Sequence, residues 1–184
     1  MNELDIRDAS PGDADGIVGV LNPIIETGEY TILDTPLTAD AERDFIRGCS
    51  PRGVFLVAVD RSDGAIVGFQ NMQPVATYTH ALDHVGDVGT YVDLRRRRQG
   101  IATQLFRATF ERARAKGYEK LFTFVRGDNP AALQTYLRHG FLVVGIAKRH
   151  ARVNGRYVDE VLIEKFLSAG ASAGAGLAAR IQGA

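Results

Sequence analysis

The chain has 184 residues, 45% of them hydrophobic and 24% charged, and its 22 basic and 22 acidic side chains balance to a net charge of zero. Such a composition is typical of one globular domain with its own core, and the balanced charge argues against a nucleic-acid-binding protein. A single cysteine excludes an internal disulfide framework. The sequence has no apolar run of transmembrane length and no signal-peptide core. We therefore expect a cytoplasmic protein with no membrane partner.

The first third of the chain predicts a strand followed by two helices. Leu4–Asp8 alternates apolar and polar residues, as a half-buried strand does. Ser10 is a typical N-cap for the next helix, although Pro23 should end or kink that helix. Thr38 caps a second, shorter helix after an irregular loop at 28–34. The residues expected to be buried on these helices are Ile17, Val20, Leu21, Ile24, Ile25, Phe45 and Ile46.

A β-hairpin and an aperiodic loop come next. Residues 54–59 and 65–73 predict two strands joined by the turn at 61–64. His80 and His84, in the following loop, have the spacing of two metal ligands on one helix face. We nevertheless expect no metal site, because no third ligand stands at a recognisable spacing.

The second half of the chain alternates strands with helices. Strands are predicted at 87–92, 121–125, 141–146 and 157–166, helices at 99–116 and between Asn129 and Gly140, and a hairpin turn at 153–156. We expect residues 1–167 to form a single domain. The Ala- and Gly-rich residues 168–184 are expected to form a flexible tail.

A basic turn, Arg95–Thr103, joins the predicted strand at 87–92 to the following helix. The first amides of a helix lack internal partners and carry the positive end of the helix dipole. A glycine there, Gly100, lets an anion approach the backbone, so the turn is a candidate phosphate cradle. The turn lacks the Gly-Lys-Ser/Thr ending of a P-loop and the three spaced glycines of the dinucleotide fingerprint. The alternative is a charged surface turn with a close-packed glycine.

Two motifs in this half resemble a known family. The pattern Arg97-x-x-Gly100-x-Ala102 is similar to the pyrophosphate loop of the GNAT superfamily of N-acetyltransferases. About thirty residues later, Asn129 is followed by Ala at +3, Tyr136 at +7 and Gly-Phe at +11, which resembles the second motif of that superfamily. The resemblance covers about residues 4–167.

The resemblance implies an α/β (α+β) fold of the GNAT type. In such a fold a mixed, mostly antiparallel central sheet of six or seven strands is splayed at the cofactor cleft and carries about four helices. It also implies acetyl-CoA as the donor substrate, with no metal. The implied cofactor-binding residues are Tyr91, Val92, Leu94, Arg97, Arg98, Gln99, Gly100, Ala102, Thr103, Asn129 and Arg138.

Particular roles follow from the same resemblance. The backbone amides of residues 97–103 would bind the pyrophosphate, while one or two arginine side chains reach the 3′-phosphate. Asn129 would contact the pantetheine arm. Tyr136 would lie near the thioester sulfur and protonate the leaving thiolate. The backbone N–H of Val92 would stabilise the oxyanion, if the central strand separates from its neighbour.

The chain is most similar to the phosphinothricin acetyltransferase-like branch. The branch has the frame Glu-x-Ser/Thr-x-Tyr-Val before the cofactor loop, with Glu as general base, and this chain has Asp87 at that place. Asp87 is therefore the first candidate for the base and His84 the second. The branch uses an arginine before this strand to hold a substrate carboxylate, whereas no Lys or Arg lies between Arg61 and Arg95.

The predicted function is acetylation of a primary amine on a small molecule, by direct attack of the amine on acetyl-CoA. Two alternatives remain open: acetylation of a protein N-terminus or lysine, and a non-catalytic acyl-CoA-binding sensor. The retention of both Asp87 and Tyr136 favours an enzyme over the sensor. A homodimer is left open as the oligomeric state.

Overall fold

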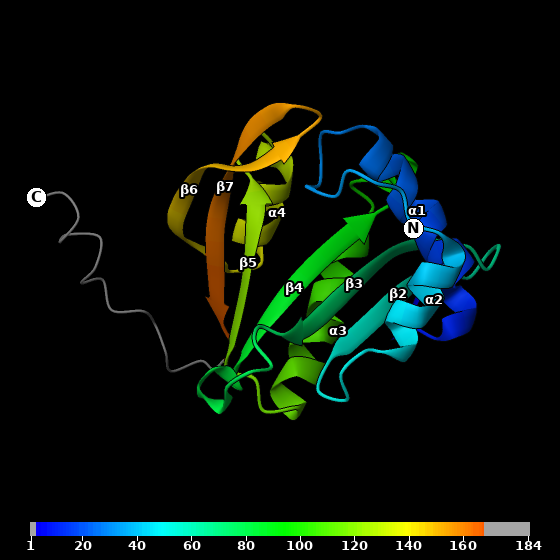
Figure 1. Cartoon of the computed structure of the whole chain (residues 1–184). Helices are drawn as coiled ribbons and strands as arrows, with labels where there is room; N and C mark the ends of the chain where they lie inside the picture. Colours follow the sequence, from blue (N-terminus) through cyan, green and yellow to red (C-terminus); the bar gives the residue numbers. More distant parts are fainter. Residues whose placement is uncertain (1–2, 168–184) are drawn as a thin grey trace, which may run out of the picture.

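Seven strands form one mixed sheet in the computed structural model, which describes residues 3–167 (Figure 1). In spatial order the strands are β1 (Leu4–Asp8), β2 (Val54–Asp60), β3 (Ile66–Pro74), β4 (Val85–Val92), β5 (Lys120–Arg126), β7 (Arg156–Phe166) and β6 (Leu142–Val153). All neighbouring pairs are antiparallel except β4 with β5. The predicted tail at 168–184 lies outside the described residues.

Helices cover both faces of the β1–β4 half of the sheet. Helices α1 (Ala14–Glu26) and α2 (Ala39–Arg47) pack on one face, with Phe55, Val57 and Phe69 in the shared core. Helix α3 (Ile101–Ala115) packs on the other face, over Leu56 and Met72. Consecutive residues of a strand point to opposite faces, so Leu56 packs in one core while Phe55 and Val57 pack in the other.

The described residues contain four α-helices in all, as the sequence predicted. The fourth, α4 (Pro130–Arg138), follows β5, and short 3-10 turns occur at η1 (Pro11–Asp13), η2 (His80–Leu82) and η3 (Leu94–Arg96). No helix within residues 3–167 combines the length and the apolar character needed to cross a membrane.

The parallel strands β4 and β5 pair over only three residues. Their register runs from Val85 with Lys120 to Asp87 with Phe122. Beyond that point β4 remains paired with β3 as far as Val92, while β5 remains paired with β7 as far as Arg126. The two strands consequently diverge toward their carboxyl ends (Figure 1), and the expected mixed sheet with a splayed centre is confirmed.

One local prediction in the first half is wrong, and Pro23 does not end its helix. Helix α1 continues through Pro23 to Glu26, although proline removes the hydrogen bond to the carbonyl of Gly19, four residues earlier. Gly19 lines an open groove, where water can take the place of the lost donor. Phe45, predicted to be buried, is 44% exposed and packs edge-to-face on Phe55 at the rim of the core.

Strand β6 is longer than its apolar stretch predicted. It continues beyond Ile146 to Val153, because β7 offers pairing partners along this whole length. The register shifts between Ala147 and Ala151, so three residues of β6 stand opposite Asp159 alone. This bulge is held by the carboxylate of Asp159, which accepts hydrogen bonds from Lys148 Nζ (2.8 Å) and from the backbone N–H of Arg149 (2.7 Å).

A buried carboxylate fixes the corner between β1 and α1. Asp13 accepts hydrogen bonds from the backbone N–H and hydroxyl of Ser10, at 2.7 and 2.8 Å. Its carboxylate also accepts two hydrogen bonds from the guanidinium of Arg7, at 2.7 and 2.8 Å. The hydrogen bonds from Arg7 and Ser10 outweigh the effect of burial and lower the pKa of Asp13 from 3.8 to about 2.

We predict that Asp13→Asn removes an acid-dependent contribution to stability. Because the folded state lowers the pKa of Asp13, its contribution is complete above the unfolded value of 3.8 and is lost as the pH falls toward 2. Urea titrations should show about 1–2 kcal/mol of lost stability at pH 7 and almost none near pH 2. Asp15→Asn, at an exposed acid of α1, is the matched control; a loss at Asp13 that does not vary with pH would contradict this account.

Candidate active site

The turn before α3 has the geometry of an anion cradle. Gly100 is the N-cap residue of α3, with a φ of 79°, and Arg98 has a φ of 60°. These two left-handed residues turn the chain from η3 into the helix and leave the first amides of α3 without helical partners. A Cβ on Gly100 would meet no other atom within 4 Å, so the space over the cradle is open.

The four arginines of the turn divide into two pairs. Arg95 is bound to Asp93 at 2.9 Å, and Arg96 is bound to the buried Asp60 at 3.2 Å. Arg97 and Arg98 are exposed beside the cradle. Arg98 lines a cavity of about 470 Å³ together with Gln99 and Gly100, among other residues. The second pair is thus better placed than the first to meet the phosphates of a ligand.

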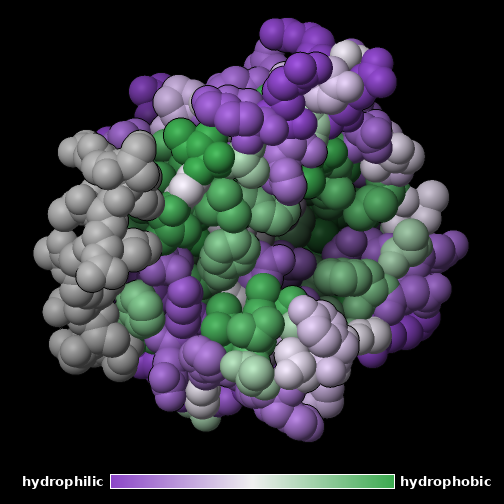
Figure 2. All heavy atoms as spheres, turned by 60° about the vertical axis from the view of Figure 1, so that its left-hand side comes forward, coloured by the Kyte–Doolittle hydropathy of each residue, from purple (hydrophilic) through white to green (hydrophobic). Residues whose placement is uncertain are grey.

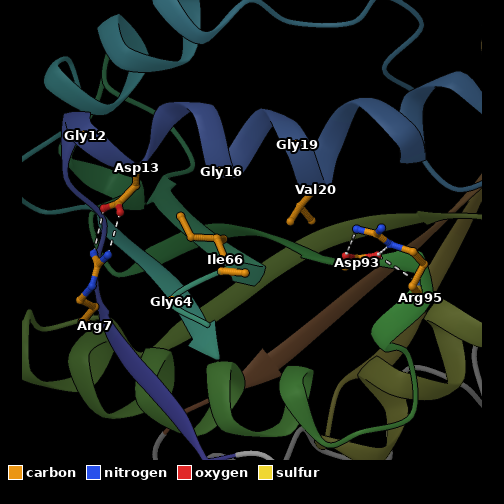
Figure 3. Close-up of a pocket in the computed structure, with 11 residues that line it drawn as sticks. Arg7, Gly12, Asp13, Gly16, Gly19, Val20, Gly64, Ile66, Asp93 and Arg95 are labelled. Carbon is orange, nitrogen blue, oxygen red and sulfur yellow. Dashed lines mark hydrogen bonds and ion pairs between the residues drawn. The ribbon is translucent and has the colours of Figure 1, made fainter. Parts of the chain in front are cut away.

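A second groove, of about 420 Å³, lies along α1 (Figure 3). Its wall includes glycines of α1 and the side chains of Arg7, Asp13, Asp93 and Arg95. These four charged groups form two ion pairs with one another, Arg7 with Asp13 and Arg95 with Asp93. The groove therefore offers a ligand little charge that is not already compensated.

The candidate base stands where β4 and β5 begin to separate. Asp87 pairs in register with Gln73 of β3, so its side chain belongs to the sheet face covered by α1 and α2. Its surface is accessible to solvent, but the surrounding protein limits hydration and raises the pKa of this carboxyl. Hydrogen bonds from the Val88 amide and the Thr123 hydroxyl oppose that rise. Asp87 is thus a more basic carboxylate than one in open solvent.

The candidate acid reaches the gap from the opposite face. Tyr136 extends from α4, and its Oη lies 3.1 Å from Oγ1 of Thr90 on β4. The ring is 7% exposed and makes edge-to-face contacts with Phe106 and Phe141. This burial raises the pKa of the Tyr136 phenol, so its hydroxyl keeps its proton at neutral pH.

The first turn of α3 lies beside the C-terminal end of α4. Thr103 Oγ1 is 3.2 Å from Nε2 of His139, whose ring stacks on Phe106 at 4.4 Å. The two sequence motifs are therefore brought together in space. Around this junction Val92, Leu94 and Ala102 are half-buried, whereas Gln99, Thr103 and Arg138 are exposed.

Two predicted cofactor residues have other partners here. Asn129 caps α4, because its Oδ1 accepts from the backbone N–H of Ala132 at 3.1 Å, and its Nδ2 donates to the carbonyl of Tyr30 at 3.4 Å. The side chain of Tyr91 stacks on Phe69 at 4.9 Å, on the α1/α2 side of the sheet. A pantetheine contact by Asn129 remains a prediction.

Arg126 is a structural residue of the site that the sequence did not reveal. It is 7% exposed, and its Nη1 donates to the carbonyls of Gly28 and Thr31 at 2.7 and 2.9 Å. Its other nitrogens bind the carboxylate of Asp128. An arginine at the end of an apolar strand was the only signal, and no local pattern could name a partner almost 100 residues away.

The segment 28–31 joins the two motifs across the gap. The ring of Tyr30 lies 4.0 Å from the guanidinium carbon of Arg97, a cation–π contact with the cradle. The Tyr30 carbonyl accepts from Asn129 at the start of α4. Residues 28–31 therefore contact the predicted cofactor loop, β5 and α4 simultaneously.

Within residues 3–167, no group of three or more His, Cys, Asp or Glu side chains is arranged to hold a metal ion. His80 is fully exposed and pairs with Asp83 at 3.0 Å. His84 is also exposed and lies in the turn immediately before β4.

Comparison with known proteins assigns this architecture. Residues 25–141 match the family described as the acetyltransferase (GNAT) family. The chain is 24% identical, over 157 residues, to an L-methionine sulfoximine/L-methionine sulfone acetyltransferase of Pseudomonas paraeruginosa. That alignment covers 84% of this chain and 89% of the relative.

Solved structures show the same fold. A GNAT-family acetyltransferase from Streptococcus pneumoniae is 30% identical, with a TM-score of 0.78 over 89% of this chain and 99% of the other. A phosphinothricin acetyltransferase from Sinorhizobium meliloti, solved with acetyl-CoA, is 21% identical, with a TM-score of 0.83 over 91% of this chain and 90% of the other.

We predict that Gly100→Val prevents coenzyme A from binding while the protein stays folded. Valine disfavours a φ of 79° and places a branched side chain over the cradle amides. Gly117→Val is the matched control, because Gly117 has a φ of 83°, equally open surroundings and a place at the opposite end of α3. Calorimetry with coenzyme A should show at least about tenfold weaker binding for Gly100→Val alone, with similar melting temperatures for both variants. Equal coenzyme A affinity in the two would remove the cradle interpretation.

Proposed function

The chain belongs to the acetyltransferase (GNAT) family, on the branch similar to phosphinothricin acetyltransferases, and from this we propose that it acetylates the primary amine of a small molecule by direct attack on acetyl-CoA. One observation carries the proposal. Asp87 and Tyr136 approach the gap between β4 and β5 from opposite faces of the sheet, and the Gly100 cradle follows the end of β4.

The amine must lose a proton, because only its lone pair attacks the thioester. Asp87 is the proposed acceptor of that proton, directly or through one water. Its raised pKa makes it a better base than an ordinary aspartate. His84 remains the alternative base.

The tetrahedral intermediate needs a hydrogen-bond donor for its oxyanion. The backbone N–H of Asp93 bonds to Val67 of β3, and strand alternation therefore turns the N–H of Val92 toward the gap. The proposed oxyanion donor is this N–H. Tyr136, protonated at neutral pH, is the proposed donor to the leaving sulfur.

Direct attack is favoured over an acetylated enzyme intermediate. Cys49 is the chain's single cysteine, and its thiol accepts a hydrogen bond from Gln73 Nε2 at 3.3 Å. Burial raises the pKa of the Cys49 thiol, so the thiolate needed for attack is scarce.

The cradle fits the donor substrate. In this proposal the amides at the start of α3 hold the pyrophosphate, as suits an anion at a helix N-terminus. Arg97 and Arg98 supply guanidinium groups for the 3′-phosphate of the donor. The Sinorhizobium meliloti relative was solved with acetyl-CoA, which supports the same donor here.

The acceptor is proposed to be a small amine. The Pseudomonas relative is named for methionine sulfoximine and methionine sulfone, both small amino-acid derivatives. This chain has no Lys or Arg between Arg61 and Arg95, and Arg126 is already engaged with Asp128 and backbone carbonyls. An acceptor carboxylate would therefore have to be held by a cation from another part of the chain.

Thiol release from acetyl-CoA, measured across amines, tests the proposal. The set should contain methionine sulfoximine, phosphinothricin, simple diamines, and peptides with free N-termini or lysines. Turnover with one of the small amines would support the proposal. Turnover with peptides alone would favour a protein acetyltransferase, and tight coenzyme A binding without turnover would favour a sensor.

We predict that Asp87→Asn removes the acidic limb of the pH–rate profile. Asparagine keeps the shape but cannot accept the proton, so kcat/KM should no longer rise with pH through the ionisation of this carboxyl. Because the folded protein raises the pKa of Asp87, the wild-type limb should lie above the range of an ordinary aspartate. His84→Gln should keep the limb, and one acceptor must be used throughout because the amine also titrates. A limb that persists in Asp87→Asn but disappears in His84→Gln would transfer the base role to His84.

We also propose a cytoplasmic location, because a chain with one cysteine has no internal disulfide and suits a reducing compartment.

A homodimer formed through β6 is a further part of the proposal. The edge strand β6 exposes apolar side chains on both of its faces, and Figure 2 shows apolar surface on this side of the molecule. The exposed residues of β6 are Leu142, Val143, Val144 and Ile146, each 49–53% exposed. A second copy related by a twofold axis would cover each edge with an identical one.

We predict that Val144→Lys yields monomers. Lysine on an edge strand opposes pairing with another copy, and its exposed position should leave the fold intact. Sedimentation velocity should show a dimer for the wild type and for Tyr78→Lys, a control at a residue that is 87% exposed elsewhere. A monomeric wild type would remove the dimer from the proposal.

A further inference from the structure

Two polar side chains lie behind the proposed acid. Gln70 of β3 and Thr90 of β4 pair in register, and Gln70 Nε2 donates to Thr90 Oγ1 at 2.6 Å. Thr90 Oγ1 is also 3.1 Å from Tyr136 Oη. The three side chains thus form one chain of hydrogen bonds, from the core of the sheet to the gap between β4 and β5.

Gln70 is an unusual residue for its place. It is completely buried, and its neighbour in register on β2 is Leu56, also completely buried. Among the described residues, its Oε1 has no hydrogen-bond partner. A buried acceptor without a partner is destabilising, and such groups in native cores call for an explanation beyond packing.

The hydrogen-bond chain has a consequence for the protons. Each hydroxyl has one proton and can donate only once. In the structure Tyr136 Oη donates to Thr90 Oγ1, which also accepts from the Gln70 amide. Rotation of the two hydroxyls reverses the Tyr136–Thr90 hydrogen bond, so that Thr90 donates to Tyr136, and leaves the hydrogen bond from Gln70 in place. When Thr90 donates to Tyr136, the proton of Tyr136 is free to point out of this chain into the gap.

Resting on the proposed acetyl transfer, we propose that Gln70 and Thr90 are positioning residues that direct the Tyr136 proton to the leaving sulfur. The neutral amine, whose first proton Asp87 has taken and released to water, forms its bond to the thioester carbon and passes a second proton to Asp87. The carbon–sulfur bond then breaks, and the sulfur takes the proton of Tyr136. The Tyr136 phenolate accepts the Thr90 hydrogen bond until water returns the proton released at Asp87.

The surroundings of Tyr136 make this support necessary. Burial opposes a phenolate, and the charges of Tyr91 and Asp87, when ionised, oppose it further. Phe106 and Phe141, which flank the ring, offer it no hydrogen bond. Thr90 supports the phenol through its side chain and through its backbone, and Thr90→Val removes the side-chain hydrogen bond alone.

The test compares Thr90→Val, which removes the hydroxyl at constant shape, with Thr90→Ser, which keeps it. Thr90→Val should lower kcat about ten- to a hundredfold, the range expected for a lost hydrogen bond to a charged group. The KM for acetyl-CoA should stay unchanged, and Thr90→Ser should restore most of kcat. In a Tyr136→Phe background, Thr90→Val should have no further effect.

Gln70→Met, which keeps the volume but removes the amide donor, should lower kcat in the wild type and not in Thr90→Val. An unchanged kcat in Thr90→Val, or an equal loss with and without the Tyr136 hydroxyl, would overturn the inference while leaving acetyl transfer intact. Normal turnover in Tyr136→Phe would overturn both the acid role and the inference.

A readout without substrate separates the inference from the proposed function. A fluorinated tyrosine at position 136 has a more acidic phenol, whose titration can be followed by absorbance in the folded protein. Thr90→Val should raise the midpoint of that titration, and Thr90→Ser should not. An unchanged midpoint in Thr90→Val would overturn the inference even if no amine were acetylated.

Discussion

The early separation of β4 and β5 is the constraint on which the rest of this structure depends. Parallel pairing stops at Asp87, although each strand continues to pair with its outer neighbour. Backbone amides at the end of β4 are thereby turned toward the gap rather than toward a partner strand. The proposed base on one face of β4 and the proposed acid Tyr136 from the other face can act on the same atoms only because this gap lies between them. The proposed chemistry is therefore a direct consequence of a sheet that does not close.

The open end of the gap is tied together by side chains from distant parts of the chain. Arg126 at the end of β5 holds the backbone of segment 28–31 through two carbonyls. Tyr30 in that segment contacts both Arg97 of the cradle and Asn129 of α4. Segment 28–31 is thus in physical contact with both predicted cofactor motifs. An arginine so deeply buried is stable only because its donors are paired, and the same pairing fixes the shape of the site.

Most of the regular elements could be predicted from the sequence, because they depend on local rules. Alternation identified β1, the turn at 61–64 identified the hairpin strands, and capping residues such as Thr38 identified helix starts. The failures were positions where a distant partner decides. Phe45 has a helical spacing suited to burial but meets only the rim of the core, and β6 extends past Ile146 because β7 is there to pair with it.

The sequence by itself determined the family and indicated the residues of the proposed chemistry. Gly100 after a run of arginines, and Asn129 before Tyr136, are short-range patterns whose meaning depends on helix termini, and helix termini are local structures. The tertiary structure decided which partners those residues meet: Thr90 and Gln70 behind Tyr136, Tyr30 over Arg97, and the carbonyls around Arg126. Such contacts join residues that lie about 20 to 100 positions apart in the chain. They follow from strand order and sheet register, which are set by the packing of the whole chain and not by any local pattern.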